Sequence, residues 1–376
     1  MHSCTLESAG RITIKENGGS VSRFTILTAL LIAAAGFAAG ASGQEQPAGN
    51  RISAQGEVHE SARLGVDTDA SGEVFIKSAA LGERLVPLGA STREESSDLK
   101  RFLAVYETSK KNVPPDEIGG WIKKHPKSVW NPSLFYCMGL AFEIGGRYTD
   151  AVGAFTAAHA GFRQALRDSG GDFPAPVSTY AGRIYDSIYA SLLSLQARLG
   201  NADEVGKLLI YEDEHFSARA VKQAAWAKYR LWDIRNKPEK SFRSGTFALS
   251  KLLPEKYSDS IMSIDAPKNG FSLLELKNIA GKYNQKLVVI KDEKDIPVPS
   301  VAYLRSGHFA AITGTSQGRI LKIEDAVAGF PRAVRENGLM HELTGYYLVA
   351  GNFKGGTAVP DSEAAGIRGL GYVPFE

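Results

Sequence analysis

The chain has 376 residues, with 44 Lys and Arg against 41 Asp and Glu, so its formal net charge is +3. This length indicates two or three domains. Hydrophobic residues make up 43% and charged residues 23%, which excludes a mostly disordered chain. The small net charge argues against a nucleic-acid-binding protein that relies on a basic face. Two cysteines exclude a disulfide-rich scaffold and a four-cysteine zinc site.

The first predicted element is an uncharged apolar stretch, residues 24–41, which follows Arg23 and precedes small residues and a polar run. A basic flank, an apolar core and a small-residue exit are typical of a secretory signal. We expect residues 1–43 to be a signal peptide and the protein to be exported to the periplasm, the cell surface or the medium. The alternative is an uncleaved membrane anchor, because ~18–20 apolar residues span a bilayer. Removal of the signal would leave Cys137 alone, without a disulfide partner.

Residues 44–97 are rich in Gly, Ser, Ala and Glu, which predicts a linker or a small β segment. Two short apolar runs in it, 74–76 and 85–88, are candidate strands. Residues 98–236 have a helical pattern. The predicted breaks between helices lie at 114–115, 125–126, 131–132, 170–176 and 200.

Residues 134–160 have the spacing of a tetratricopeptide repeat, a helical hairpin. The positions that carry it are Gly139, Phe142, Gly146, Tyr148, Ala151, Phe155 and Ala158. The small residues let two antiparallel helices approach closely, the large ones fill the groove, and Gly146 makes the turn. A weaker copy covers 192–209, with Gly200 at its turn. Such helices serve either as a peptide-docking groove or as a packing collar for the domain that follows.

Other reactive side chains in the helical region have simpler interpretations. Cys137 lies on the apolar face of the first hairpin and is predicted to fill core space. His159 and His215 have no partners at metal-ligand spacing, and His341 has no second histidine one helical turn away, so no metal is expected. No glycine-rich phosphate loop is present, so no cofactor is expected.

After residue 237 a helical start is followed by several strand-like runs, which is an α+β pattern. The predicted strands are 286–290, 300–304, 308–312, 319–323 and 345–349. The last stretch, 351–376, contains five glycines after Gly351 and is predicted to be a flexible tail.

Five blocks in this region carry a resemblance to a known family. They are PEKSFRSGTFAL at 238–249, GFSLLELKNIAGK at 270–282, PVPSVAYLRSGHFAAI at 297–312, IEDAVAG at 323–329 and LMHELTGYYLV at 339–349. In order and spacing they resemble the bacteriocin-processing cysteine peptidases, papain-like enzymes that cut after double-glycine leaders. The resemblance covers 237–350, under a third of the chain.

The resemblance implies a papain-like α+β domain of helix plus antiparallel sheet, preceded by the all-α repeat region. It places the nucleophile position at Ser244, the base at His308 and the group that orients the base at Asp325. It also places a narrow substrate cleft at Gly245, Gly307 and Phe309, which in the family accepts two glycines.

The sequence departs from the family at the positions that would carry out catalysis. Ser244 replaces the cysteine nucleophile, Thr246 and Ala326 replace prolines, and Pro238 stands where the family has an oxyanion-stabilising glutamine. A hydroxyl is a far weaker acid than a thiol, so Ser244 would need full assistance from a base. Losing one oxyanion donor lowers a rate by about 10²–10³. Little or no cleavage is therefore expected.

Three functions follow from these observations. The first is a degenerate peptidase that binds an extended peptide or protein segment, such as one with a Gly-Gly pair, and barely cuts it. The second is an active hydrolase that uses Ser244, His308 and Asp325. The third is an interaction scaffold in which the helical repeats bind the partner; His308 and Asp325 would then be a buried pair that joins two strands. Nucleic acid is not an expected partner, and the membrane is one only through residues 24–41.

Overall fold

The computed structural model describes residues 5–7, 11–13, 67–68, 74–173, 178–215 and 217–374. The chain divides into two units, 1–59 and 60–376. In the first unit, strand β1 (Thr5–Glu7) pairs antiparallel with β2 (Arg11–Thr13). The expected signal or anchor at 24–41 and most of the expected linker lie outside the described residues. No helix in the described part is long and apolar enough to cross a membrane.

Of the two alternatives predicted for the segment before the helices, its described part agrees with the small β segment and not with a free linker. Strand β3 (Asp67–Thr68) pairs with β4 (Val74–Phe75), and an isolated bridge joins Ile76 to Leu85. Both of these side chains are fully buried, in a core that also holds Leu99, Leu103 and Trp130. Helix α1 (Arg93–Thr108) begins five residues before the predicted start, because Thr92 caps it by accepting a hydrogen bond from the Glu95 amide.

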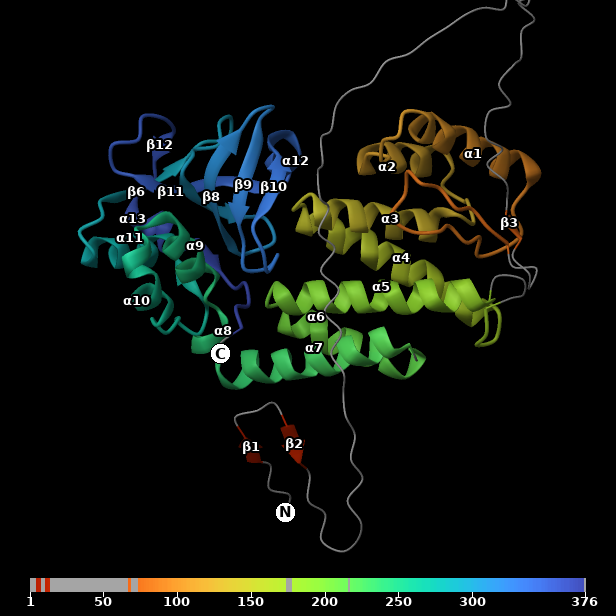
Figure 1. The fold of residues 1–376 in the computed structure, drawn as a ribbon, viewed down its shortest axis with the longest axis horizontal. Helices are drawn as coiled ribbons and strands as arrows, with labels where there is room; N and C mark the ends of the chain where they lie inside the picture. Colours follow the sequence, from red (N-terminus) through yellow and green to blue (C-terminus); the bar gives the residue numbers. More distant parts are fainter. Residues whose placement is uncertain are drawn as a thin grey trace, which may run out of the picture. The chain divides into compact units, whose positions relative to one another are not determined.

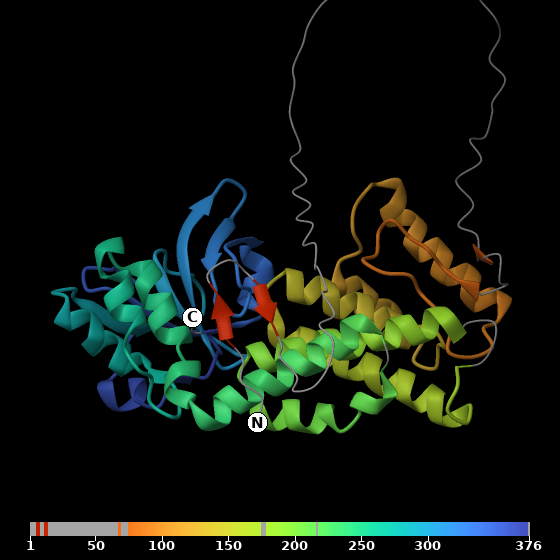
Figure 2. The ribbon, with the colours of Figure 1, turned by 60° about the horizontal axis from the view of Figure 1, so that its bottom comes forward.

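The predicted helical region is helical, and each predicted break lies at a boundary between two helices, whereas the break after residue 209 is not predicted. They are α2 (Pro115–Lys124), α3 (Asn131–Ile144), α4 (Tyr148–Asp168), α5 (Ser178–Arg198), α6 (Ala202–Leu209), the short 3₁₀ turn η1 (Glu212–Glu214) and α7 (Ala218–Asn236). Helix α4 packs beside α3 and α5, and α5 beside α7 (Figure 1, Figure 2). A Cβ on Gly139 would lie 2.5 Å from the Phe155 ring, so the predicted close approach of α3 and α4 is confirmed.

The remaining chain combines short helices with a seven-stranded antiparallel sheet and a separate two-stranded one, which makes the fold α+β. The helical elements are α8 (Pro238–Ser241), α9 (Ser244–Leu252), η2 (Glu255–Tyr257), α10 (Ser258–Met262), α11 (Leu273–Lys282), α12 (Glu336–Met340) and α13 (Asp361–Ala364). The strands of the sheet are β6 (Leu287–Lys291), β7 (Ser300–Leu304), β8 (Phe309–Ser316), β9 (Ile320–Glu324), β10 (Arg332–Arg335), β11 (Leu343–Ala350) and β12 (Thr357–Ala358). Their order is β10-β9-β8-β7-β11-β6-β12. Each of the five predicted strands begins within two residues of its expected start.

Both faces of the sheet are buried at its centre, which explains why β7 and the first half of β8 are apolar without a polar alternation, whereas β9 and β10 alternate between buried and exposed residues. On β8, Phe309 and Ala311 pack in a core with helices α9 and α11, whereas Ala310 and Ile312 pack in a core with helices α4 and α5. Successive side chains of a strand point to opposite faces, so one strand serves both cores. The two faces of the sheet therefore contribute to two different cores, and the core on one face is shared with the helical region.

The prediction that residues 351–376 form a flexible tail is wrong for the described part, residues 351–374. Strand β12 pairs with β6, and β13 (Arg368–Gly369) pairs antiparallel with β5 (Phe271–Ser272). Tyr372 and Val373 are only 3% and 6% exposed. The apolar side chains between the glycines join the core, and this burial outweighs the backbone freedom that the glycines would otherwise confer.

Candidate functional site

Ser244 is the first residue of helix α9 and is completely buried. The amides of a helix's first turn have no partner within the helix, so they are free to bind an external carbonyl. The Ser244 amide donates to the backbone carbonyl of Gly371 at 3.3 Å. The next residue, Gly245, packs against the core: its Cβ would lie 3.0 Å from Leu276 and 3.1 Å from Phe271. The structure therefore places Gly245 where α9 packs against α11.

His308 lies at the start of β8, after a turn at Gly307, and it is completely buried. Its Nε2 is 3.1 Å from Oδ1 of Asp325, which follows the neighbouring strand β9. Its Nδ1 is hydrogen-bonded to the Ser306 hydroxyl at 3.1 Å. The structure thus brings together the predicted histidine and aspartate across two adjacent strands.

Two groups besides His308 form hydrogen bonds with Asp325. The Tyr148 hydroxyl donates to Oδ2 at 2.6 Å, and the Val327 amide donates to Oδ1 at 2.8 Å. Burial alone raises the pKa of Asp325, but His308 and these hydrogen bonds stabilise the carboxylate and leave the pKa below its ordinary value. The pKa of Tyr148 is well above its usual range because of its burial and the nearby Asp325. The sequence pattern places Tyr148 in a helical repeat and gives no sign of this contact.

Ser244 is not coupled to this pair. Among the hydrogen bonds of the described residues, none joins Ser244 to His308; the Ser244 hydroxyl accepts a 3.5 Å contact from the Phe309 amide. Both ring nitrogens of His308 are hydrogen-bonded to other side chains, Ser306 and Asp325. Pro238 begins helix α8 and has no amide to offer as an oxyanion donor. The arrangement binds a peptide carbonyl, that of Gly371, and shows no hydrogen bond between Ser244 and His308.

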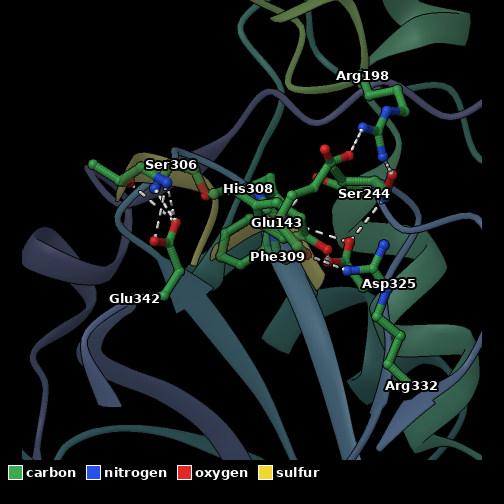
Figure 3. Close-up of polar contacts among 12 residues, drawn as sticks. Glu143, Arg198, Ser244, Ser306, His308, Phe309, Asp325, Arg332 and Glu342 are labelled. Atoms are coloured by element: carbon green, nitrogen blue, oxygen red, sulfur yellow. Dashed lines mark hydrogen bonds and ion pairs between the residues drawn. The ribbon is translucent and has the colours of Figure 1, made fainter. Parts of the chain in front are cut away.

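A buried glutamate supports the other side of His308. Glu342 accepts hydrogen bonds from the Ser306 amide and from the amide and hydroxyl of Thr149, each at 3.1 Å. Burial raises its pKa in spite of these bonds. Figure 3 shows Ser306 and Glu342 on one side of His308 and Asp325 on the other. Glu342 thereby links helix α4 to the turn before His308.

Helix residues also hold the loop that follows Asp325. Arg198 donates to the Val327 carbonyl at 2.6 Å and forms an ion pair with Glu143 (Figure 3). Arg332 donates to the Glu143 carbonyl at 2.6 Å. Phe142 and Tyr148, the residues of the predicted docking groove, are 6% and 1% exposed. This burial supports the alternative of a packing collar.

The chain segment 369–373 lies across Ser244 and His308. A Cβ on Gly371 would be 2.7 Å from the His308 Cβ and 2.9 Å from the Ser244 Cβ. The Leu370 amide donates to the Gly307 carbonyl at 2.8 Å, and a Cβ on Gly369 would lie 2.5 Å from the Phe309 ring. Gly307 and Phe309, which the resemblance places in a substrate cleft, therefore contact this segment.

The other candidate residues are packing residues. Cys137 is buried, and burial raises the pKa of its thiol to about 12. His159 and His215 lie in a buried aromatic cluster, where His215 Nδ1 is 2.9 Å from Asp186 and burial lowers the pKa of His159 to about 4. No group of three or more His, Cys, Asp or Glu in the described part of the chain is arranged to hold a metal ion.

Comparison of the chain with protein-family models, curated proteins and solved structures found no match.

Proposed function

We propose that residues 237–374 form a papain-like domain of the bacteriocin-processing peptidase type that binds an extended peptide across Ser244 and His308 with little or no cleavage. The helical region, with its tetratricopeptide-like hairpins, serves as a collar that completes and rigidifies the site. We also propose that the N-terminal segment directs export of the protein.

One observation carries the proposal. A peptide carbonyl, that of Gly371, is hydrogen-bonded to the amide at the start of helix α9, next to a histidine whose two ring nitrogens are bound to other side chains. The helix N-terminus favours the negative end of a carbonyl dipole, so binding needs no reactive side chain. Cleavage would need a base on the Ser244 hydroxyl, and His308 is turned toward Asp325 and Ser306.

The experiment compares binding and cleavage in one peptide pool. We expect the wild type and Ser244→Ala to leave every peptide intact by mass spectrometry, because His308 is hydrogen-bonded to Asp325 and Ser306 and not to the Ser244 hydroxyl. A variant with an opened site, Gly371→Val, should retain extended peptides from the pool on an affinity matrix, and Ser244→Ala should not change this retention. Cleavage by the wild type that is lost in Ser244→Ala would replace the proposal with a serine hydrolase. Failure of the folded, opened protein to retain any peptide would overturn it.

Ser244→Cys tests the same site from the opposite direction. A thiol at a helix N-terminus has a lowered pKa and needs less help from a base. Cleavage by this variant alone would show a peptide-binding cleft that lacks only its nucleophile, and would support the proposal.

A further inference from the structure

We propose that the groove beside Ser244 and His308 is a binding site for an extended segment with glycine at two alternate positions and tyrosine directly after the second, and that residues 369–372, Gly-Leu-Gly-Tyr, occupy it as a ligand in cis. This inference rests on the proposed peptide-binding function and adds the pattern that the groove accepts.

Backbone hydrogen bonds hold the segment as a bound strand would be held. The amides of Leu370, Tyr372 and Val373 donate to the carbonyls of Gly307, Arg198 and Ser241 at 2.8, 3.0 and 2.9 Å. The Gly371 carbonyl accepts from the Ser244 amide, as described above. Four separate elements therefore bind consecutive residues, and main-chain bonds of this kind give affinity without depending on side chains.

Side-chain selectivity comes from close approach at the two glycines. At position 371 any side chain would meet Cβ atoms of His308 and Ser244 at 2.7 and 2.9 Å, and at position 369 it would meet the Phe309 ring at 2.5 Å. Real Cβ atoms do not tolerate such distances. Leu370, between them, points elsewhere and is only half-buried. The groove thus requires glycine at alternate positions and accepts an apolar residue between them.

The residues that line the groove also lie very close to the backbone of residues 369–370. A Cβ on Gly200 would lie 2.1 Å from the Leu370 carbonyl oxygen, and a Cβ on Gly270 would lie 2.0 Å from the Gly369 carbonyl oxygen. Gly200 belongs to the turn between α5 and α6, and Gly270 precedes β5. The wall therefore comes from both the helical region and the sheet domain.

Tyrosine at the last position is recognised by the helical region. Tyr372 is 3% exposed, and its hydroxyl donates to Oδ2 of Asp233 on α7 at 3.1 Å. A buried carboxylate oxygen left without this donor would be costly, so the pocket discriminates against phenylalanine. The amide of the same residue is bound by Arg198 at the end of α5.

Ser244 and His308 are both completely buried while the segment is in place. A second peptide can reach them only when residues 369–373 leave the groove. The segment is therefore a competitive occupant, and a peptide with the same pattern should bind in trans once the segment is displaced.

The test uses a fluorescent peptide that copies residues 368–373 and measures its anisotropy on the full chain. The protein variant Gly371→Val should displace the segment, and Gly366→Val, outside the groove, is its matched control. Tyr372→Ala is a second displacing variant without a steric clash, and circular dichroism confirms that each protein is folded. We expect Gly371→Val and Tyr372→Ala to bind the peptide at least about tenfold more tightly than the wild type and Gly366→Val, which corresponds to about 1.4 kcal/mol.

Peptides that carry Gly369→Ala, Gly371→Ala or Tyr372→Phe test the pattern on the opened proteins. Each should bind at least about tenfold more weakly than the parent peptide. The proposed pattern would be wrong if all four peptides bound equally, or if the opened proteins preferred unrelated peptides. The proposed peptide-binding function would still hold in both cases. Equal binding to opened and wild-type proteins would overturn occupancy in cis. If the opened proteins retain no peptide from any source, the proposed function itself fails.

Discussion

The Tyr148 hydroxyl donates a 2.6 Å hydrogen bond to Oδ2 of Asp325, across 177 residues of sequence. The two residues come from the helical region and from the sheet domain, and both side chains are buried. The orientation of Asp325, and through it that of His308, therefore depends on a helix that precedes the sheet domain in the chain.

Tyr148→Phe should destabilise the protein by about 1–3 kcal/mol, because Oδ2 of Asp325 would lose its donor in a buried place. Urea unfolding measures the change. The control is Tyr346→Phe, which removes a hydroxyl bonded to Glu363 at the exposed surface and should cost no more than about 0.5 kcal/mol. Equal losses in the two variants would show that Asp325 does not depend on Tyr148.

Gly139→Ala and Gly153→Ala form a matched pair in the first helical hairpin. A Cβ at Gly139 would meet the Phe155 ring, so overpacking should cost about 1–3 kcal/mol. A Cβ at Gly153 meets nothing within 4 Å, so the better helix propensity of alanine should stabilise the protein by about 0.5–1 kcal/mol. Thermal unfolding should shift in opposite directions. A shift in the same direction would contradict the close packing of α3 on α4.

Asp325 should make stability sensitive to acid. A carboxyl whose pKa is lower in the folded than in the unfolded protein stabilises the fold above its unfolded pKa, and this contribution is lost as the pH falls through the folded pKa. Below about pH 4, the free energy of unfolding should therefore fall more steeply for the wild type than for Asp325→Asn.

Glu342 acts in the opposite sense, since its raised pKa means that the folded state holds its proton more tightly. Glu342 is present in both the wild type and Asp325→Asn, so its contribution cancels in the difference between their free energies of unfolding. Urea unfolding of the two proteins at several pH values measures that difference. Parallel curves would exclude a lowered pKa at Asp325.

Cys137 should resist alkylation in the native protein. Burial raises the pKa of its thiol to about 12, and the group donates to the Glu83 carbonyl, so almost no thiolate is present at pH 8. Peptide mass spectrometry after brief treatment with iodoacetamide should find Cys137 unmodified, and modified after unfolding in guanidinium. Modification at the same rate in both states would mean that this part of the core opens readily.

The sequence predicts the elements of the fold better than their contacts. Prolines and glycines mark the helix ends because they act locally, and apolar runs mark the strands because both faces of the sheet are buried. Residues 351–374 are predicted poorly. Their glycines suggest freedom, whereas the structure uses several of them for close approach to other parts of the chain.

The site is predicted in part. The Gly-His-Phe block and the aspartate 17 residues later identify the pair that the structure brings together. Tyr148, Arg198 and Gly371 are missed, because their roles depend on contacts between distant segments that no local spacing encodes. The sequence does contain a signal for the role of Gly371. Apolar residues alternate with glycine around it, which is unusual for a solvated tail; they are Ile367, Leu370, Tyr372 and Val373.

The segment 369–373 also bears on how the protein is made. Its partners, Arg198, Ser241, Ser244 and Gly307, are all synthesised well before it. A nascent chain that has not yet released residues 369–373 from the ribosome would carry an uncovered groove, with the Ser244 amide and the carbonyls of Arg198, Ser241 and Gly307 unpaired. Contacts of such long sequence separation form slowly, so during this interval the groove is exposed to aggregation. Closure of the groove would then be a late step of folding, after its walls have formed.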